Sequence, residues 1–252
     1  MKMLGLRRIA SIVFYAILAG GALASDCSYY STQIATTPIP PQIPESLGQS
    51  IGLLSRIPNR QDLVFVGDSL LSGWSEDVPA SPGLFFNFSV GNDKTQNVLW
   101  RLAHKNVSQL APKRVVILVG TNNFNDPGME PCGIAAGIKR VVIDVEMMWP
   151  AAKLFVVGIL PRGPDFQLFN AARKEINDDI REATYGRDNV KFVQVDEEKL
   201  TCGGIKSRPL PSMAMICAPS DVFRCENYKN DNLHLSSGGY RILMEALLRE
   251  GL

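Results

Sequence analysis

The chain has 252 residues, of which 46% are hydrophobic and 20% are charged, which suits one large globular domain better than two small ones. Its 26 basic and 25 acidic residues give a net charge of +1. No block of basic residues follows the N-terminal region, so a nucleic-acid partner is not expected, because such partners need a basic face to contact phosphates.

The first 24 residues have the pattern of a secretory signal peptide. Three basic residues precede an apolar run over residues 9–24, and Ala22-Leu23-Ala24 fits a cleavage site. An uncleaved anchor is the alternative, but this run is shorter than the roughly 20 residues that span a bilayer. We expect cleavage after Ala24, a periplasmic or secreted location and no stable membrane insertion of the mature chain, which keeps 23 basic and 25 acidic residues.

All five cysteines lie after the expected cleavage site, where an oxidising compartment would allow disulfides. Their pairing cannot be read from the spacing, and five leaves at least one thiol free or paired elsewhere. Three of them lie between residues 202 and 225, where a bridge would close a long irregular loop over residues 197–230. A zinc site is the competing interpretation, but the spacings match no zinc motif and the chain has two histidines. The cysteines are Cys27, Cys132, Cys202, Cys217 and Cys225.

Residues 25–60 read as a proline-rich N-terminal arm ahead of a domain over residues 61–252. Pro40-Pro41 opposes regular helix or sheet. A short amphipathic piece at residues 51–54 is expected to dock the arm onto the domain.

From residue 62 onward, short apolar runs alternate with helical stretches. Apolar stripes at helical spacing occur around residues 99–110, 134–149 and 240–248. This alternation predicts a parallel sheet with helices on both faces, and the ligand crevice of such a sheet lies at the carboxyl ends of the strands. The predicted strands are residues 62–67, 84–90, 114–120, 153–160 and 190–195.

Polar residues follow two of these strands. Ser69 lies where the first predicted strand turns into a helix, so it is either a nucleophile at the crevice or a helix N-cap. Asn122 follows the third predicted strand, where its amide could donate to a developing oxyanion or simply complete a turn.

A serine nucleophile needs a base, and the chain offers only His104 and His234. His104 falls within a helical run, where a structural role is expected. His234 is three residues after Asp231, a spacing that allows the carboxylate to orient the imidazole. Asp68, beside Ser69, is expected to have a structural hydrogen-bonding role, and Asp93 reads as a turn residue.

These motifs together resemble the GDSL/SGNH hydrolase superfamily, and most of all its branch of platelet-activating-factor acetylhydrolase catalytic subunits. The resemblance rests on VFVGDSLLSGW (64–74), NFSVGNDKTQNVLWRL (87–102), VVILVGTNN (115–123), LPRG (160–163) and DNLHLSSGGY (231–240).

The resemblance implies a flavodoxin-like three-layer α/β/α fold with a mainly parallel five-stranded sheet. It implies Ser69 as nucleophile, His234 as general base and Asp231 as its partner. The backbone N–H of Ser69, a backbone N–H of the second motif and the Asn122 side chain would form the oxyanion hole. No metal or cofactor is implied.

The second motif departs from the family pattern, which has glycine before the aspartate. Here Gly91-Asn92-Asp93 places Asn92 at the donor position, although Gly91 could shift into the role. Asparagine tolerates left-handed backbone angles, but its side chain is expected to crowd the hole and favour a short acyl group.

The sequence therefore predicts an exported serine esterase acting on a short-chain, acetyl-like acyl ester of a small molecule or glycan. Three alternatives stay open. They are an O-acyltransferase that modifies an envelope or secreted glycan with the same residues, a lysophospholipase or thioesterase, and a non-catalytic binding module. The oligomeric state is not predicted.

Overall fold

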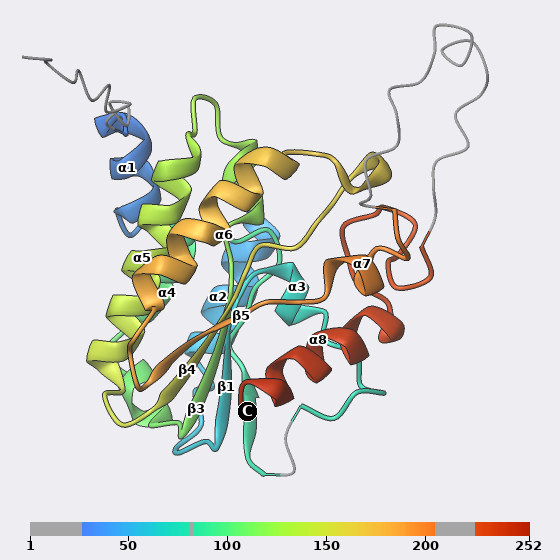
Figure 1. Ribbon diagram of the computed structural model, residues 1–252. Helices are drawn as coiled ribbons and strands as arrows, with labels where there is room; N and C mark the ends of the chain where they lie inside the picture. Colours follow the sequence, from blue (N-terminus) through green and yellow to red (C-terminus); the bar gives the residue numbers. More distant parts are fainter. Residues whose placement is uncertain (1–26, 81–82, 205–224) are drawn as a thin grey trace, which may run out of the picture.

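The computed structural model describes residues 27–80, 83–204 and 225–252, so the expected signal peptide and Cys217 lie outside the described residues. Five parallel strands form one sheet in the order β2-β1-β3-β4-β5 (Figure 1). All five predicted strands are confirmed. The first ends at Gly67 as predicted, and the other four end two or three residues before their apolar runs do, because the chain leaves the sheet into the loops at that edge. The strands are β1 (Leu63–Gly67), β2 (Phe85–Asn87), β3 (Arg114–Leu118), β4 (Lys153–Val157) and β5 (Val190–Val193).

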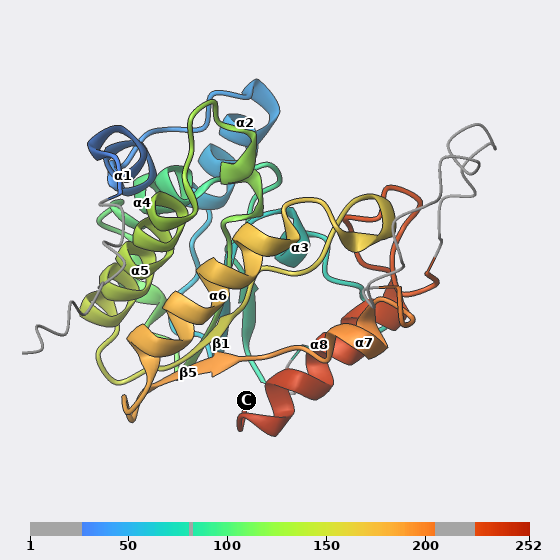
Figure 2. The same ribbon diagram turned by 45° about the horizontal axis from the view of Figure 1, so that its top comes forward.

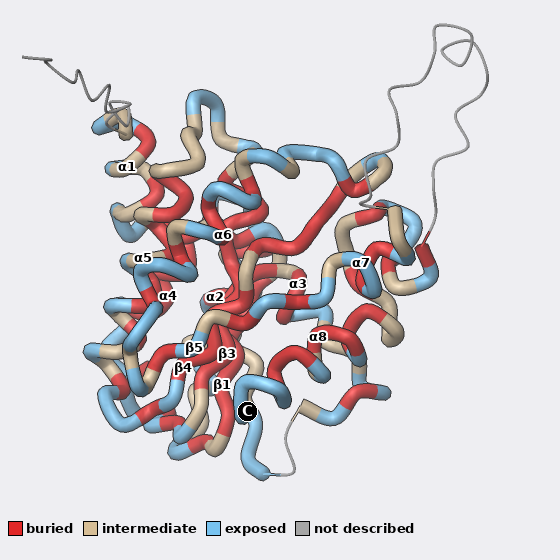
Figure 3. Tube along the Cα trace, in the orientation of Figure 1, coloured by how far each residue is buried: buried red, intermediate tan, exposed pale blue. Residues whose placement is uncertain are grey.

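Helices cover both faces of the sheet, as the alternating pattern predicted. Successive side chains of β1 enter opposite layers: Val64 and Val66 join one apolar cluster, while Leu63 and Phe65 join the other. The buried strands therefore run through the middle of three layers (Figure 3). The first cluster is covered by α4 (Thr95–Leu102), α5 (Pro131–Met148) and α6 (Asn170–Thr184), and the second by α3 (Ser69–Ser72), α7 (Glu197–Leu200) and α8 (Ser237–Arg249).

The N-terminal arm is more regular than its prolines suggested. It contains α1 (Tyr29–Thr36) and α2 (Pro44–Leu54), and the segments between and after these helices are irregular. The side chain of Ser28 caps α1, and Pro44 lies in the first turn of α2, where its missing N–H removes no helical hydrogen bond.

The arm packs on the outside of α5. Gly133 makes this contact possible, because a Cβ there would lie 2.0 Å from the Ser31 Oγ atom of α1. A disulfide between Cys27 and Cys132 joins the same two elements. Figure 2 shows α1 beside α4 and α5, on the opposite side of the sheet from α8.

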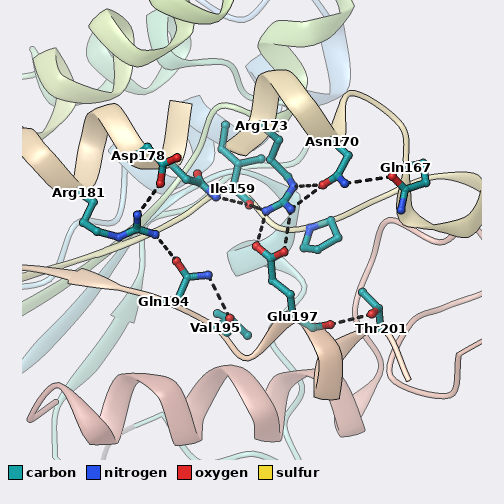
Figure 4. Close-up of polar contacts among 12 residues, drawn as sticks. Ile159, Gln167, Asn170, Arg173, Asp178, Arg181, Gln194, Val195, Glu197 and Thr201 are labelled. Atoms are coloured by element: carbon teal, nitrogen blue, oxygen red, sulfur yellow. Dashed lines mark hydrogen bonds and ion pairs between the residues drawn. The ribbon is translucent and has the colours of Figure 1, made fainter. Parts of the chain in front are cut away.

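A buried arginine connects the layers near the end of β4. Arg173 of α6 is 1% exposed and contacts both carboxylate oxygens of Glu197, at 2.6 and 2.9 Å. It also donates to the Ile159 carbonyl at 3.1 Å and to the Asn170 side chain at 2.7 Å (Figure 4). This network fixes α7 against α6 and the segment that leaves β4.

Three short 3-10 helices complete the described part of the chain: η1 (Val107–Leu110), η2 (Thr121–Asn125) and η3 (Pro164–Phe166). A second disulfide, Cys202–Cys225, agrees with the bridge expected across the long loop. Within the described ranges, every helix is too short or too polar to cross a bilayer.

Candidate active site

Ser69 lies where β1 turns sharply into α3. Gly67 permits the turn, because a Cβ at this position would lie 2.1 Å from the Leu118 carbonyl oxygen of β3. Asp68 caps the short helix by accepting a hydrogen bond from the Leu70 N–H at 2.9 Å. The turn leaves Ser69 half-buried at the carboxyl edge of the sheet.

The three side chains predicted to act together do meet. The Ser69 Oγ atom lies 3.0 Å from His234 Nε2, and His234 Nδ1 lies 2.7 Å from an oxygen of Asp231. With the Nδ1 proton donated to Asp231, Nε2 is left with a lone pair that can accept the Ser69 hydroxyl proton. The arrangement can therefore activate a serine oxygen.

Asp231 is held in place by the chain that follows it. Its other oxygen accepts hydrogen bonds from the backbone N–H groups of Leu233 and His234, both at 2.9 Å. Burial alone would raise the pKa of Asp231, but hydrogen bonds from the side chain and backbone of His234, together with that of Leu233, outweigh it and lower the pKa below its ordinary value. The carboxylate of Asp231 is thus ionised at any pH at which His234 can act as a base.

The residues predicted for the oxyanion hole come from the loops after β2 and β3. Asn122 is 7% exposed and donates one amide hydrogen to the Asp93 carbonyl at 3.0 Å, which leaves the other hydrogen for a ligand. Asn92 has a left-handed backbone (φ 62°). Among the described residues, the N–H groups of Ser69, Gly91 and Asn92 have no hydrogen-bond partner. The geometry leaves both Gly91 and Asn92 as candidate donors.

Asp93 follows the turn at residues 91–92, in keeping with the turn role that the sequence suggested, and its side chain has a further role. Its carboxylate and the guanidinium of Arg101 are both fully buried and form an ion pair. Arg101 also donates to the Phe88 carbonyl at 3.0 Å, and burial lowers its pKa to about 9. This pair fixes the loop that carries Gly91 and Asn92 to the end of β2.

Asn123 makes a second connection that sequence reasoning missed. Its side chain accepts from the Thr95 N–H at 3.0 Å and donates to the Thr95 hydroxyl and the Gln96 side chain. These bonds tie the loop after β3 to the start of α4. Sequence alone could not assign this role, because Asn123 is the same residue type as its neighbour Asn122, the candidate oxyanion donor.

Arg162, from the LPRG segment, also contacts the loop after β3, through Phe124. It is 6% exposed, and its guanidinium contacts the rings of Phe124 and Phe169 at 5.7 and 5.2 Å. The next residue, Gly163, donates to the Asn232 carbonyl at 2.8 Å. The segment of Arg162 and Gly163 therefore contacts both the loop after β3, through Phe124, and the loop that carries Asp231 and His234, through Asn232.

Asp68 has the structural role expected of it. It is fully buried, and burial raises its pKa to about 7, against the opposing effects of the Leu70 hydrogen bond and the charge of Arg162. His104, the other histidine, lies exposed beyond the end of α4, with its ring at the edge of Trp100. The structure thus separates His104 from the candidate site.

Within the described ranges, one group of side chains has the ligand types of a metal site: Cys27, Glu130 and Cys132. The two cysteines are joined in a disulfide, so they offer no thiolate to a metal ion. A zinc site therefore gains no support from these residues.

The sequence matches the model of the GDSL-like Lipase/Acylhydrolase family over residues 65–242, a region that contains Ser69, Asn122, Asp231 and His234. The chain belongs to the GDSL-like lipase/acylhydrolase family. The resemblance inferred from the motifs is thereby confirmed, and the membership makes this chain an ester-hydrolysing serine hydrolase.

Curated relatives of this family member support the branch suggested by its motifs. It is 32% identical over 192 residues to the alpha1 subunit of platelet-activating factor acetylhydrolase IB from Rattus norvegicus, covering 74% of this chain and 73% of the relative. It is 31% identical over 192 residues to the alpha2 subunit from the same species, covering 74% of each chain.

Solved structures share the fold of this GDSL-family chain. A GDSL-like lipase from Bacteroides thetaiotaomicron has a TM-score of 0.51 at 18% identity, covering 81% of this chain and 93% of the lipase. A lipolytic G-D-S-L family protein from Veillonella parvula has a TM-score of 0.53 at 15% identity, covering 75% of this chain and 97% of that protein. The predicted three-layer α/β/α architecture is confirmed.

Proposed function

We propose that this GDSL-family protein is an exported esterase that hydrolyses an acyl ester through an acyl-enzyme on Ser69. The observation that carries the proposal is the continuous hydrogen-bonded chain from Asp231 through His234 to the Ser69 hydroxyl. It is the arrangement that a serine nucleophile requires.

The reaction proceeds in two acyl transfers. His234 Nε2 takes the hydroxyl proton as Ser69 Oγ attacks the ester carbonyl, and the carbonyl oxygen becomes an oxyanion. That oxyanion receives hydrogen bonds from the Asn122 amide and from the free N–H groups of Ser69 and the 91–92 segment. His234 then gives its proton to the departing alcohol, and the acyl group stays on Ser69.

Water completes the cycle. His234 takes a proton from the attacking water, the resulting hydroxide adds to the acyl carbonyl, and the proton returns to Oγ as the carboxylic acid leaves. Asp231, whose pKa is lowered by its hydrogen bonds to His234, stabilises the imidazolium that forms in each half of the reaction.

Export is the part of the proposal supported by the N-terminal sequence. Residues 1–24 have the charge and apolar pattern of a cleaved signal, and four of the five cysteines pair in two disulfides, which persist in oxidising compartments. A periplasmic or secreted location accounts for both features.

The acyl group is not restricted to acetyl in this proposal. The expectation of a short acyl group assumed that the Asn92 side chain would crowd the oxyanion hole. Asn92 is exposed and lines a groove beside the candidate hole, which removes the reason for that restriction.

The test is hydrolysis of p-nitrophenyl acetate, butyrate and octanoate by the mature protein beside Ser69→Ala. The variant is expected to lose activity by roughly 10⁵–10⁶-fold, as when the nucleophile of a serine hydrolase is removed. Equal turnover by both proteins would overturn the serine mechanism. Folded wild-type protein that hydrolyses none of the esters, with or without a glycan acceptor, would overturn the esterase proposal.

A further inference from the structure

A cavity of about 370 Å³, here called the arm groove, lies between the N-terminal arm and the loops of the candidate oxyanion hole. Ile34, Ile39 and Ile43 of the arm form its apolar wall, and Lys94 and Asp126 line it from outside the arm. Asn92 also lines it, so the groove includes a residue of the candidate oxyanion hole. Its volume is within the range of small-molecule sites.

The groove is preformed because the arm is bonded to α4 along its length. The Ile39 N–H donates to the Gln96 carbonyl at 3.1 Å, and the Asn97 side chain donates to the Ile39 carbonyl at 3.0 Å. Thr95 Oγ1 donates to the Ala35 carbonyl at 2.8 Å. The wall that carries the isoleucines is thus fixed relative to the catalytic loops.

Several of the polar side chains that line the groove already have hydrogen-bond or ion-pair partners. Lys94 and Asp126 form an ion pair, and Gln96 donates to the second oxygen of Asp126 at 3.1 Å. Asn97 accepts the Lys94 N–H at 2.9 Å, in addition to its bond to the arm. What the groove offers to a ligand is chiefly the apolar surface of the isoleucines, which suits a hydrocarbon chain better than a sugar.

The positions of His234 and of the arm relative to the two faces of the sheet indicate which part of a bound ester, the alcohol or the acyl group, lies nearer the groove. His234 must protonate the leaving alcohol, and its neighbour Leu235 belongs to the apolar cluster under α8. The arm packs on the other cluster, where Leu53 and Leu54 contact the layer of α4 and α5 (Figures 1 and 2). The alcohol therefore leaves on the side of His234, and the groove lies on the acyl side.

We propose that the arm groove binds the alkyl end of the acyl group and makes the enzyme favour medium-length apolar acyl chains over acetyl. The inference rests on the proposed esterase function. The arm residues of the groove precede residue 65, where the match to the family model starts, so the specificity is supplied by this chain's own arm.

The experiment measures kcat/KM of the mature protein for p-nitrophenyl acetate, butyrate and octanoate, beside Ile43→Asp. Ile43 is 44% exposed, so the substitution leaves the core intact while placing a charge in the groove. Ile51→Asp is the matched control, because Ile51 is a 54% exposed isoleucine of α2 that does not line the groove. Circular dichroism checks that each variant is folded.

The wild type is expected to prefer octanoate, and Ile43→Asp is expected to lower the octanoate-to-acetate ratio by roughly 10-fold, the effect of losing a methylene or more of pocket contact. Ile51→Asp should keep the wild-type ratio. Ser69-dependent hydrolysis with the same ratio in all three proteins would overturn the groove proposal alone. Hydrolysis unaffected by Ser69→Ala would overturn the proposed function instead.

Discussion

At the residue scale, the orientation of the peptide between Gly91 and Asn92 is fixed by Ser46, a residue of the arm that precedes the family match over residues 65–242. Ser46 of α2 is buried and donates its hydroxyl to the Gly91 carbonyl at 2.8 Å. The carbonyl of Gly91 and the N–H of Asn92 belong to one planar trans peptide and point in opposite directions. Holding the carbonyl toward the arm therefore turns the N–H of Asn92 away from the arm.

This contact predicts that Ser46→Ala slows catalysis without weakening binding. The peptide would lose the bond that orients it, and we expect kcat to fall by about 10-fold, less than the 10²–10³-fold cost of removing an oxyanion donor itself. KM should stay within about 2-fold, because an oxyanion donor acts in the transition state. Ser46→Thr, which keeps the hydroxyl, should recover most of the rate. A rise in KM with kcat unchanged would contradict the positioning role.

Asp68 gives the molecule a distinctive pH dependence. Its pKa is raised from 3.8 to about 7 by burial, so the folded state binds this proton more tightly than the unfolded state does. The stability that protonated Asp68 contributes is present below its unfolded pKa and is lost as the pH rises toward 7.

The corresponding prediction compares denaturant unfolding of wild type and Asp68→Asn at about pH 5 and pH 8. Asparagine can keep the helix cap but carries no charge, so the variant should lose less stability across this interval, by on the order of 1–2 kcal/mol. Parallel pH profiles for the two proteins would show that Asp68 is ionised throughout.

At the scale of elements, the buried ion pair of Arg173 and Glu197 connects α6 to α7. Arg173→Met leaves the carboxylate of Glu197, whose side chain is 21% exposed, without its partner, so the substitution should cost about 2 kcal/mol of unfolding free energy. Arg181→Met is the matched control on the same helix, since Arg181 pairs with Asp178 at the surface and should cost less than about 1 kcal/mol. Equal losses in urea unfolding would contradict this difference.

The three inner strands, β1, β3 and β4, were predictable because both of their faces are buried, so their sequences are continuous apolar runs. The edge strands β2 and β5 are partly exposed and were recognised from shorter apolar runs. The helices of the arm were not, because α1 is short and its stability comes from packing on α5 through the close approach at Gly133. Ser69, Asn122 and the Asp231–His234 pair were found because chemistry limits which residue types can act there. Arg101 and Asn123 carry no such restriction, and their importance appears only when the loops after β2 and β3 meet.

At the scale of the whole molecule, the disulfide between Cys27 and Cys132 closes the longest covalent loop of the described chain, with a sequence separation of 105. A crosslink of this span restricts the unfolded chain strongly. It also ties the start of the arm to the layer of helices on which the arm groove is built.

Replacing both cysteines, as Cys27→Ser with Cys132→Ser, should therefore lower stability by about 2–4 kcal/mol and reduce the octanoate-to-acetate ratio as the arm loosens. The double variant Cys202→Ser with Cys225→Ser removes the other bridge, whose cysteines do not line the groove, and should leave the ratio unchanged. Thermal melts and the three-ester assay measure the two effects. An unchanged ratio in the first variant would show that the arm keeps its place without the disulfide.

The central claim is that Ser69 forms the covalent intermediate with the help of His234. The most direct measurement is mass spectrometry of the mature protein after treatment with diisopropyl fluorophosphate, which marks an activated serine. The account predicts one adduct, on the peptide that contains Ser69, together with loss of esterase activity, and no adduct in His234→Ala. An adduct elsewhere that accompanies inactivation, or labelling of Ser69 that persists without His234, would contradict it.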